Sequence, residues 1–219
     1  MASNLESPKW LGFLERYLRW LAIPNLAIIL VTLQVLGFLL VTTDPIWLDR
    51  LALYPGQVLQ GEYWRLITFL SLPLTLNPFW VIFGLWFLYF ILDTIEREWG
   101  AFKTTFYVLV SIVLTIAVSF ALDLPVLEVT DLQSTLFLAA AALFPEFEVR
   151  LFFIIPVKMR WLGWLTLTFL FVRLFQSSWD GRFYLLAIYS NYCLFFGPVL
   201  VNRIRQWIRR ENFKKQLRR

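Results

Sequence analysis

The chain has 219 residues, of which 59% are hydrophobic, 19% are aromatic and only 16% are charged. A soluble domain is typically about 45–50% apolar and about 25% charged, so this composition excludes an ordinary soluble domain and predicts a membrane protein. The sequence has no histidine and one cysteine, Cys193. Chemistry that uses histidine as a base or metal ligand is therefore excluded, as are disulfides within the chain and cysteine-cluster metal sites, and no cofactor is predicted.

Residues 1–20 are predicted to form an N-terminal interfacial amphipathic helix. Ser7 and Pro8 are typical of an N-cap and a first helical position. Apolar residues then recur at helical spacing, at Trp10, Leu11, Leu14, Tyr17, Leu18 and Leu21. Such a stripe is typical of a helix that lies in the plane of the membrane interface.

Residues 21–201 contain six apolar stretches, most of them separated by Pro or Gly. A helix needs about 20 apolar residues to cross about 30 Å of hydrocarbon, so these stretches predict an all-α, polytopic membrane domain with six transmembrane helices. The predicted spans are Leu21–Val41, Ile67–Asp93, Thr104–Leu122, Asp131–Phe144, Leu162–Phe175 and Phe183–Val201. The fourth and fifth are short, which indicates tilting, local thinning of the bilayer or burial within the bundle.

The basic residues predict a multi-pass protein with both termini in the cytoplasm. In that orientation 16 of the 20 Lys and Arg lie inside, and only Arg50, Arg65, Arg173 and Arg182 lie outside or near the outer ends. This bias follows the positive-inside rule and also explains the net charge of +5, so no nucleic-acid partner is predicted. Short loops and the lack of a luminal domain favour a bacterial inner membrane over an endoplasmic reticulum.

Residues 202–219 form a basic cytoplasmic tail with eight Lys or Arg and one Glu. Each basic residue near an anionic surface contributes about 1 kcal/mol, so the tail is predicted to lie on anionic lipids of the inner leaflet. An acidic protein partner is the alternative. The residues expected to contact lipid are Arg203, Arg205, Arg209, Arg210, Lys214 and Lys215.

Three motifs occur in a fixed order along the spans. The first loop contains Trp64-Arg65 and then Thr68, the second span ends in Glu96-Arg97-Glu98-Trp99-Gly100, and Phe152–Lys158 precedes the fifth span. With six spans and inside termini, these motifs resemble the rhomboid superfamily over roughly residues 20–202, and the first loop with its Asn77-Pro78-Phe79 hinge is similar to derlins. The resemblance implies a rhomboid-like bundle in which the motif residues Trp64, Arg65, Thr68, Glu96, Trp99 and Gly100 serve the fold.

A charge near the bilayer is costly unless it is paired or solvated. Arg65 is therefore expected to anchor the first loop, and Glu96 to cap loop backbone on the cytoplasmic side; a functional role for either is the alternative. Asn191 and its neighbours Tyr189, Ser190 and Tyr192 place polar groups inside the sixth span. They either line a hydrated cavity or form hydrogen bonds between helices.

The resemblance also implies where rhomboid proteases would carry their chemistry. Their nucleophilic serine falls near Thr130 here, with Ser134 as the alternative, and their histidine base falls near Ser190. Their oxyanion-stabilising residues fall near Trp80 and Gly84. Every chemical position is altered, so no catalytic residue is predicted. Thr130 is better explained as the N-cap of the fourth span, with Asp131 in its first turn.

These observations predict a rhomboid-like pseudoprotease rather than an enzyme. It would bind transmembrane segments of other membrane proteins, for client retention or quality control, through a lateral opening near the second and fifth helices. One alternative is a lipid-directed protein whose short spans and Trp-rich first loop thin the bilayer and move or sense lipid. The other is a residual intramembrane serine protease.

Overall fold

The computed structural model describes residues 9–151 and 155–197 of the chain. This part is mostly helical, as predicted. Its elements are α1 (Lys9–Leu18), η1 (Arg19–Leu21), α2 (Leu26–Thr43), α3 (Ile46–Leu51), α4 (Pro55–Leu59), α5 (Arg65–Thr68), η2 (Phe69–Ser71), α6 (Pro78–Trp99), α7 (Ala101–Leu122), α8 (Thr130–Leu143), β1 (Glu148–Leu151), β2 (Ile155–Lys158), α9 (Met159–Gln176) and a last helix over residues 179–197.

Three helices of the described part, α2, α6 and α7, are long and apolar enough to cross a membrane. The predicted fourth, fifth and sixth spans fall on α8, α9 and the last helix. However, α8 has only 14 residues. The other two helices contain charged residues, Arg160 and Arg173 in α9 and Asp180 and Arg182 in the last helix. Every predicted span is therefore largely helical where it is described, but only three helices combine the length and composition of a membrane span.

The second span begins later than predicted. The predicted start at Ile67 is wrong, because α6 begins at Pro78. Residues 65–71 form α5 and η2, and Pro73 lies between them and α6. Proline has a fixed φ and no N–H, so it is tolerated in a first helical turn but interrupts a helix elsewhere. Asn77 caps α6, since its side-chain oxygen accepts a hydrogen bond from the Phe79 N–H at 3.0 Å.

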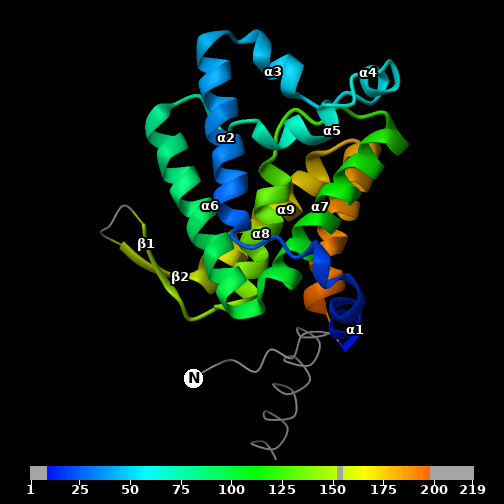
Figure 1. Cartoon of the computed structure of the whole chain (residues 1–219). Helices are drawn as coiled ribbons and strands as arrows, with labels where there is room; N and C mark the ends of the chain where they lie inside the picture. Colours follow the sequence, from blue (N-terminus) through cyan, green and yellow to red (C-terminus); the bar gives the residue numbers. More distant parts are fainter. Residues whose placement is uncertain (1–8, 152–154, 198–219) are drawn as a thin grey trace, which may run out of the picture.

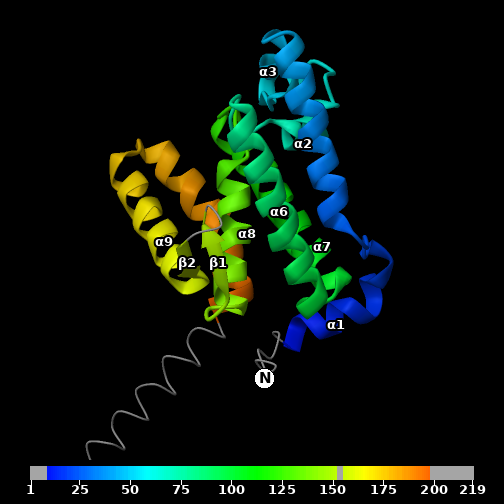
Figure 2. The same cartoon turned by 90° about the vertical axis from the view of Figure 1, so that its left-hand side faces the viewer.

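The longer helices pack as a bundle, with short elements at its ends. Helix α6 contacts α2, α7 and α8, and α8 also contacts α9. Figure 1 shows α3, α4 and α5 at one end of the bundle and α1 at the opposite end. In the side view of Figure 2, α8 lies between α9 and α6. Helix α8 therefore has α6 and α9 on its two sides.

Small residues allow the closest packing within the bundle. A Cβ atom at Gly37 of α2 would overlap the backbone carbonyl of Ser71 in η2, so the two backbones touch. On α7, Ser111, Thr115 and Ser119 are buried. Membrane helices associate through such close contacts because apolar side chains gain little by leaving lipid for protein.

A two-stranded antiparallel hairpin, β1–β2, connects α8 to α9 and departs from the all-α prediction. Val149 pairs with Val157, and Glu148 pairs with Lys158. In β2 the β-branched residues Ile155 and Val157 alternate, which favours extended backbone. The rhomboid-like segment Phe152–Lys158 falls here, and its residues 152–154 lie outside the described part.

Candidate functional site

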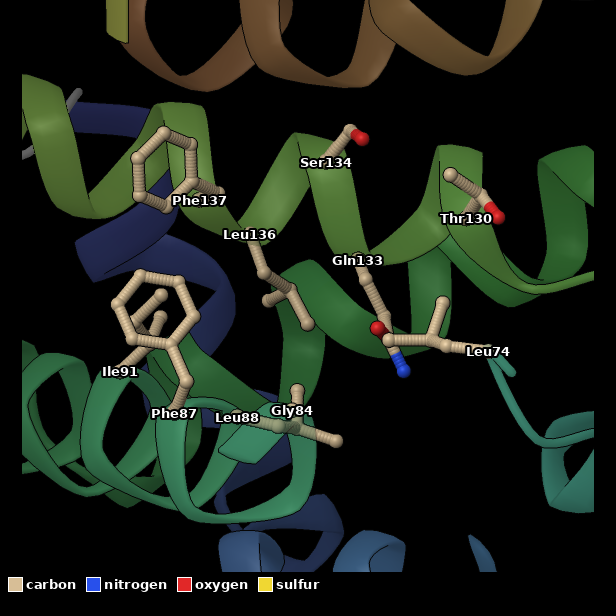
Figure 3. A pocket seen from close by; sticks show the side chains of 10 residues that line it. All are labelled: Leu74, Gly84, Phe87, Leu88, Ile91, Thr130, Gln133, Ser134, Leu136 and Phe137. Carbon is tan, nitrogen blue, oxygen red and sulfur yellow. The ribbon is translucent and has the colours of Figure 1, made fainter. Parts of the chain in front are cut away.

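A cavity of about 230 Å³ lies between α6 and α8, and Figure 3 shows the side chains around it. The walls are mainly apolar. They consist of Leu74, Gly84, Phe87, Leu88, Ile91, Thr130, Gln133, Ser134, Leu136 and Phe137. Three of these residues, Gly84, Thr130 and Ser134, are positions where the rhomboid resemblance places chemistry. The fold therefore gathers part of the predicted site around one cavity.

The hydroxyl groups of Thr130 and Ser134, which belong to the α8 residues in the lining, do not both point into the cavity. Figure 3 shows the Ser134 hydroxyl on the side of α8 away from α6, whereas Gln133 and Leu136 point toward α6. Thr130 is the first residue of α8 and Val129 is the N-cap, so the predicted capping role of Thr130 is wrong. The Thr130 hydroxyl donates instead to the Glu128 carboxylate at 3.1 Å.

Ser190 and Trp80 do not line this cavity. Ser190 lies on an exposed face of the last helix, and its hydroxyl donates to the Ala187 carbonyl at 2.6 Å. Trp80 is 46% exposed. Tyr189, the neighbour of Ser190, points to α8 instead, since successive residues on a helix point about 100° apart.

A polar cluster around a buried carboxylate joins α8, α9 and the last helix, and the sequence pattern did not predict it. Asp131, in the first turn of α8, is only 5% exposed. Its carboxylate accepts hydrogen bonds from Nη1 and Nη2 of Arg173, at 2.7 and 3.4 Å, and from the Tyr189 hydroxyl at 3.4 Å. Burying an unpaired ion costs several kcal/mol, so Arg173 is the partner that Asp131 requires. The sequence does contain a signal for this pair, because opposite charges occur at the outer ends of successive predicted spans.

The same cluster borders a second and larger cavity, of about 460 Å³. This cavity is lined by Leu124, Pro125, Val126, Leu127, Glu128, Asp131, Arg173, Gly181 and Tyr184. The loop that forms one wall is tied to the first loop, because Leu53 and Val126 exchange two backbone hydrogen bonds of 3.1 and 2.9 Å. Within residues 9–151 and 155–197, no group of three or more Asp, Glu, His or Cys side chains is placed to hold a metal ion.

Arg65 anchors the first loop, as predicted. Its side chain is 4% exposed and its Nε donates to the Glu62 carboxylate at 2.5 Å. Its Nη1 donates to the carbonyls of Asp49 and Ala52, at 2.5 and 2.8 Å. Thr68 also holds this loop, since its hydroxyl donates to the Leu51 carbonyl at 3.2 Å. The third motif residue of the loop, Trp64, is 55% exposed.

Glu96 caps backbone at the start of α2, as predicted. Its two carboxylate oxygens accept hydrogen bonds from the N–H groups of Asn25 and Leu26, at 2.8 and 3.3 Å. These N–H groups have no carbonyl partner within the helix, and a carboxylate also interacts favourably with the positive end of the helix dipole. Gly100 links α6 to α7 with a φ of 88°, a conformation that favours glycine. Trp99 stacks on Phe196 with the ring centroids 4.8 Å apart.

Asn191 links the last helix to α7. Its side-chain nitrogen donates to the Tyr107 carbonyl at 3.1 Å and to the Ser111 hydroxyl at 2.5 Å. Of the two predicted alternatives for this residue, hydrogen bonding between helices is therefore the one observed. The predicted lipid-contacting residues Arg203, Arg205, Arg209, Arg210, Lys214 and Lys215 lie outside the described residues.

The site thus consists of an apolar cavity between α6 and α8 and a charged cavity where α8 begins and α9 ends. Two anchoring residues, Arg65 and Glu96, hold the loops around the helices. No family model, curated protein or solved structure matches this chain, and the resemblance to rhomboids stays a prediction from its motifs.

Proposed function

We propose that this chain is a six-span, rhomboid-like membrane protein that binds transmembrane segments of other membrane proteins without cleaving them. The observation that carries this proposal is the mainly apolar cavity between α6 and α8. It includes Gly84, Thr130 and Ser134, where the resemblance places protease chemistry, yet the sequence supplies no histidine as a base. A groove between two helices suits the apolar side chains of another helix.

The surroundings of the cavity support approach from within the bilayer. Large apolar side chains are exposed on both helices that flank α8, including Trp86 on α6 and Phe169 and Phe171 on α9. In lipid, such surfaces gain little from apolar contact alone, so association depends on shape and close packing. The cavity offers a recess into which side chains of a client helix would fit.

Photocrosslinking in native membranes tests the proposal. A photoreactive residue at Phe87, which lines the cavity, is expected to capture membrane proteins. The matched control is Ile28, which is 52% exposed on α2 and does not line the cavity. Gly84→Leu adds a side chain to the lining and is expected to reduce capture at Phe87. Equal capture at both positions, or none at Phe87, would contradict client binding.

A lipid-directed function is the second candidate, and the length of α8 favours it. Fourteen residues span about 21 Å at 1.5 Å per residue, against about 30 Å of hydrocarbon, so α8 would thin the bilayer locally if it crosses alone. The test is lipid scrambling by the reconstituted protein in vesicles. Vesicles that scramble no faster than protein-free vesicles would count against this candidate.

Residual proteolysis is tested by incubation with a model transmembrane substrate. We expect no cleavage, because the hydroxyls of Thr130 and Ser134 have no histidine base. Cleavage that disappears in Ser134→Ala or Thr130→Ala would instead show that the chain is a protease.

A further inference from the structure

We propose that the cavity beside Asp131 and Arg173 binds the headgroup of a zwitterionic aminophospholipid, with the phosphate on Arg173 and the ammonium on Glu128. This site is separate from the cavity between α6 and α8. The inference therefore does not depend on client binding, and each proposal fails on its own test.

The size and position of the cavity suit a headgroup. Ligand sites commonly have volumes of about 300–1,000 Å³. This cavity of about 460 Å³ falls within that range, whereas the cavity of about 230 Å³ between α6 and α8 is smaller. Its loop is bonded to the first loop through Leu53 and Val126. Figure 1 shows the first-loop helices α3 and α4 at one end of the bundle. A cavity at the end of a membrane bundle lies at the depth of lipid headgroups.

Arg173 is the group that would bind phosphate. Its side chain is 44% exposed, and two of its nitrogens donate to Asp131. Because a guanidinium has five N–H donors, donors remain for a second anion, and the planar fork matches phosphate oxygens well. The Asp131 carboxylate is neutralised by the same pair, so it does not repel the phosphate as a free carboxylate would.

Glu128 is the group that would bind the ammonium. It is exposed in the lining, and its carboxylate accepts one hydrogen bond in the described structure, from Thr130 at 3.1 Å. A carboxylate has about four acceptor positions, which leaves several for an ammonium. Tyr184 lines the same cavity and adds an aromatic face, a surface that attracts cations.

The charge of the lining selects a zwitterion over other headgroups. With Arg173 and Asp131 paired, Glu128 leaves the lining with one net negative charge, which repels an anionic headgroup. A purely cationic ligand leaves the remaining N–H donors of Arg173 without an acceptor. A zwitterion satisfies both groups. Leu127 in the lining is 56% exposed and Phe183 beside Tyr184 is 58% exposed, and these apolar side chains offer contact surface to acyl chains. We therefore assign the ligand to the bilayer rather than to a soluble phosphoethanolamine.

Native mass spectrometry of the purified full chain tests the assignment. The delipidated protein is mixed with equal amounts of phosphatidylethanolamine and phosphatidylglycerol that have identical acyl chains. We expect the wild type to retain phosphatidylethanolamine preferentially. Glu128→Gln keeps the shape of an exposed side chain but removes the charge, and should reduce the preference about tenfold, the effect of losing one charge-assisted hydrogen bond. The matched control is Glu98→Gln, an exposed glutamate on α6.

A second variant removes the phosphate partner. Asp131→Asn combined with Arg173→Gln replaces the ion pair by neutral polar groups and should abolish the retention of phosphatidylethanolamine. If this variant does not fold, the comparison of Glu128→Gln with the wild type still tests the proposal, because Glu128 is exposed and its replacement does not require the ion pair to change. A wild type without lipid preference, or an unchanged preference in Glu128→Gln, would overturn the proposal. Calorimetric binding of free phosphoethanolamine as tight as that of the lipid would overturn the assignment to the bilayer.

Discussion

Arg65 is a charged side chain in an apolar loop, and its partners explain why it is tolerated there. It donates to a carboxylate and to two backbone carbonyls of the segment that contains α3. Its guanidinium also lies 5.5 Å from the ring centroid of Tyr54. Burial raises the pKa of the Tyr54 hydroxyl, and a hydrogen bond to Asp49 raises it further, so the tyrosine stays neutral beside these charges. One side chain therefore determines how the first loop folds back on itself.

Replacing Arg65 by Ala should be strongly destabilising. The change leaves two carbonyls and the Glu62 carboxylate without their donor, and each buried polar group that loses its partner typically costs about 1–3 kcal/mol. Arg65→Lys keeps the charge but not the planar fork, so we expect an intermediate loss. Reversible unfolding in mixed micelles measures both.

Arg50 provides the control for this prediction. It is exposed in the same loop and its guanidinium lies over the Trp47 ring at 5.3 Å. Arg50→Ala should change the free energy of unfolding by less than about 1 kcal/mol. If Arg65→Ala unfolds as easily as Arg50→Ala, the anchoring role of Arg65 is wrong.

At the scale of the elements, α2 is held at two points by residues distant in sequence. Glu96 at the end of α6 caps its first N–H groups, and η2 packs against Gly37 in its middle. The contact with Glu96 is electrostatic, whereas the contact with η2 is possible because Gly37 has no side chain. Together they fix α2 against η2 and against the last turn of α6.

Gly37→Ala should destabilise the bundle although alanine is the better helix former. The added Cβ would overlap the Ser71 carbonyl, and overpacking of this kind typically costs about 1–3 kcal/mol. Gly12 in α1 is the matched control, because a Cβ there meets nothing within 4 Å. Gly12→Ala should be neutral or stabilising by up to about 1 kcal/mol. Thermal unfolding of the two variants under the same conditions makes the comparison, and equal melting temperatures would refute the close contact.

The hairpin should be less protected from hydrogen exchange at low pH. A hydrogen bond from Lys158 lowers the pKa of Glu146, and Arg160 lowers it further. Because the folded pKa lies below the unfolded value of about 4.3, the contribution of this carboxylate is present above that pH and is lost as the pH falls through the folded pKa. Amide hydrogen exchange, corrected for the intrinsic rate, should show reduced protection of the hairpin below about pH 4.

Two variants show whether Glu146 is the group responsible. Glu146→Gln should remove most of the pH dependence of hairpin protection, since glutamine does not titrate. Glu98→Gln, an exposed position on α6, should leave it unchanged. A pH dependence that persists in Glu146→Gln would assign the effect to another carboxylate.

At the scale of the whole molecule, the helices differ in how well their length and composition suit a membrane span. Helices α2, α6 and α7 meet the length and composition of a span, whereas α8 is short and α9 carries two arginines. The ion pair between Asp131 and Arg173 reduces the cost of a charge in α9, because paired charges are tolerated within helix bundles.

Cysteine labelling from one side of the membrane distinguishes six spans from three. The background is Cys193→Ser, and single cysteines replace Leu127 before α8 and Glu148 after it. With six spans, α8 crosses the membrane and the two positions label from opposite sides. With three spans, the chain stays on one side after α7 and both positions label together. Leu59→Cys, which is 76% exposed before α6, should label from the same side as Leu127 in either case.

The sequence by itself determined the features that depend on composition and on local pattern. An excess of apolar residues indicated helices in a membrane, and the positions of Arg65 and Glu96 indicated anchoring roles that the contacts confirm. These inferences succeed because a charged side chain near lipid is costly unless it has a partner, wherever in the sequence that partner lies.

Only the tertiary structure decided which helix faces meet. Tyr189 rather than Ser190 points to α8, Asp131 pairs with Arg173 across 42 positions of sequence, and the segment after α8 folds as a hairpin. Apolar stretches in a membrane are hydrophobic all round, so their periodicity does not mark an inward face. Rotation and pairing then depend on long-range packing and hydrogen bonds, which the pattern of one segment does not contain.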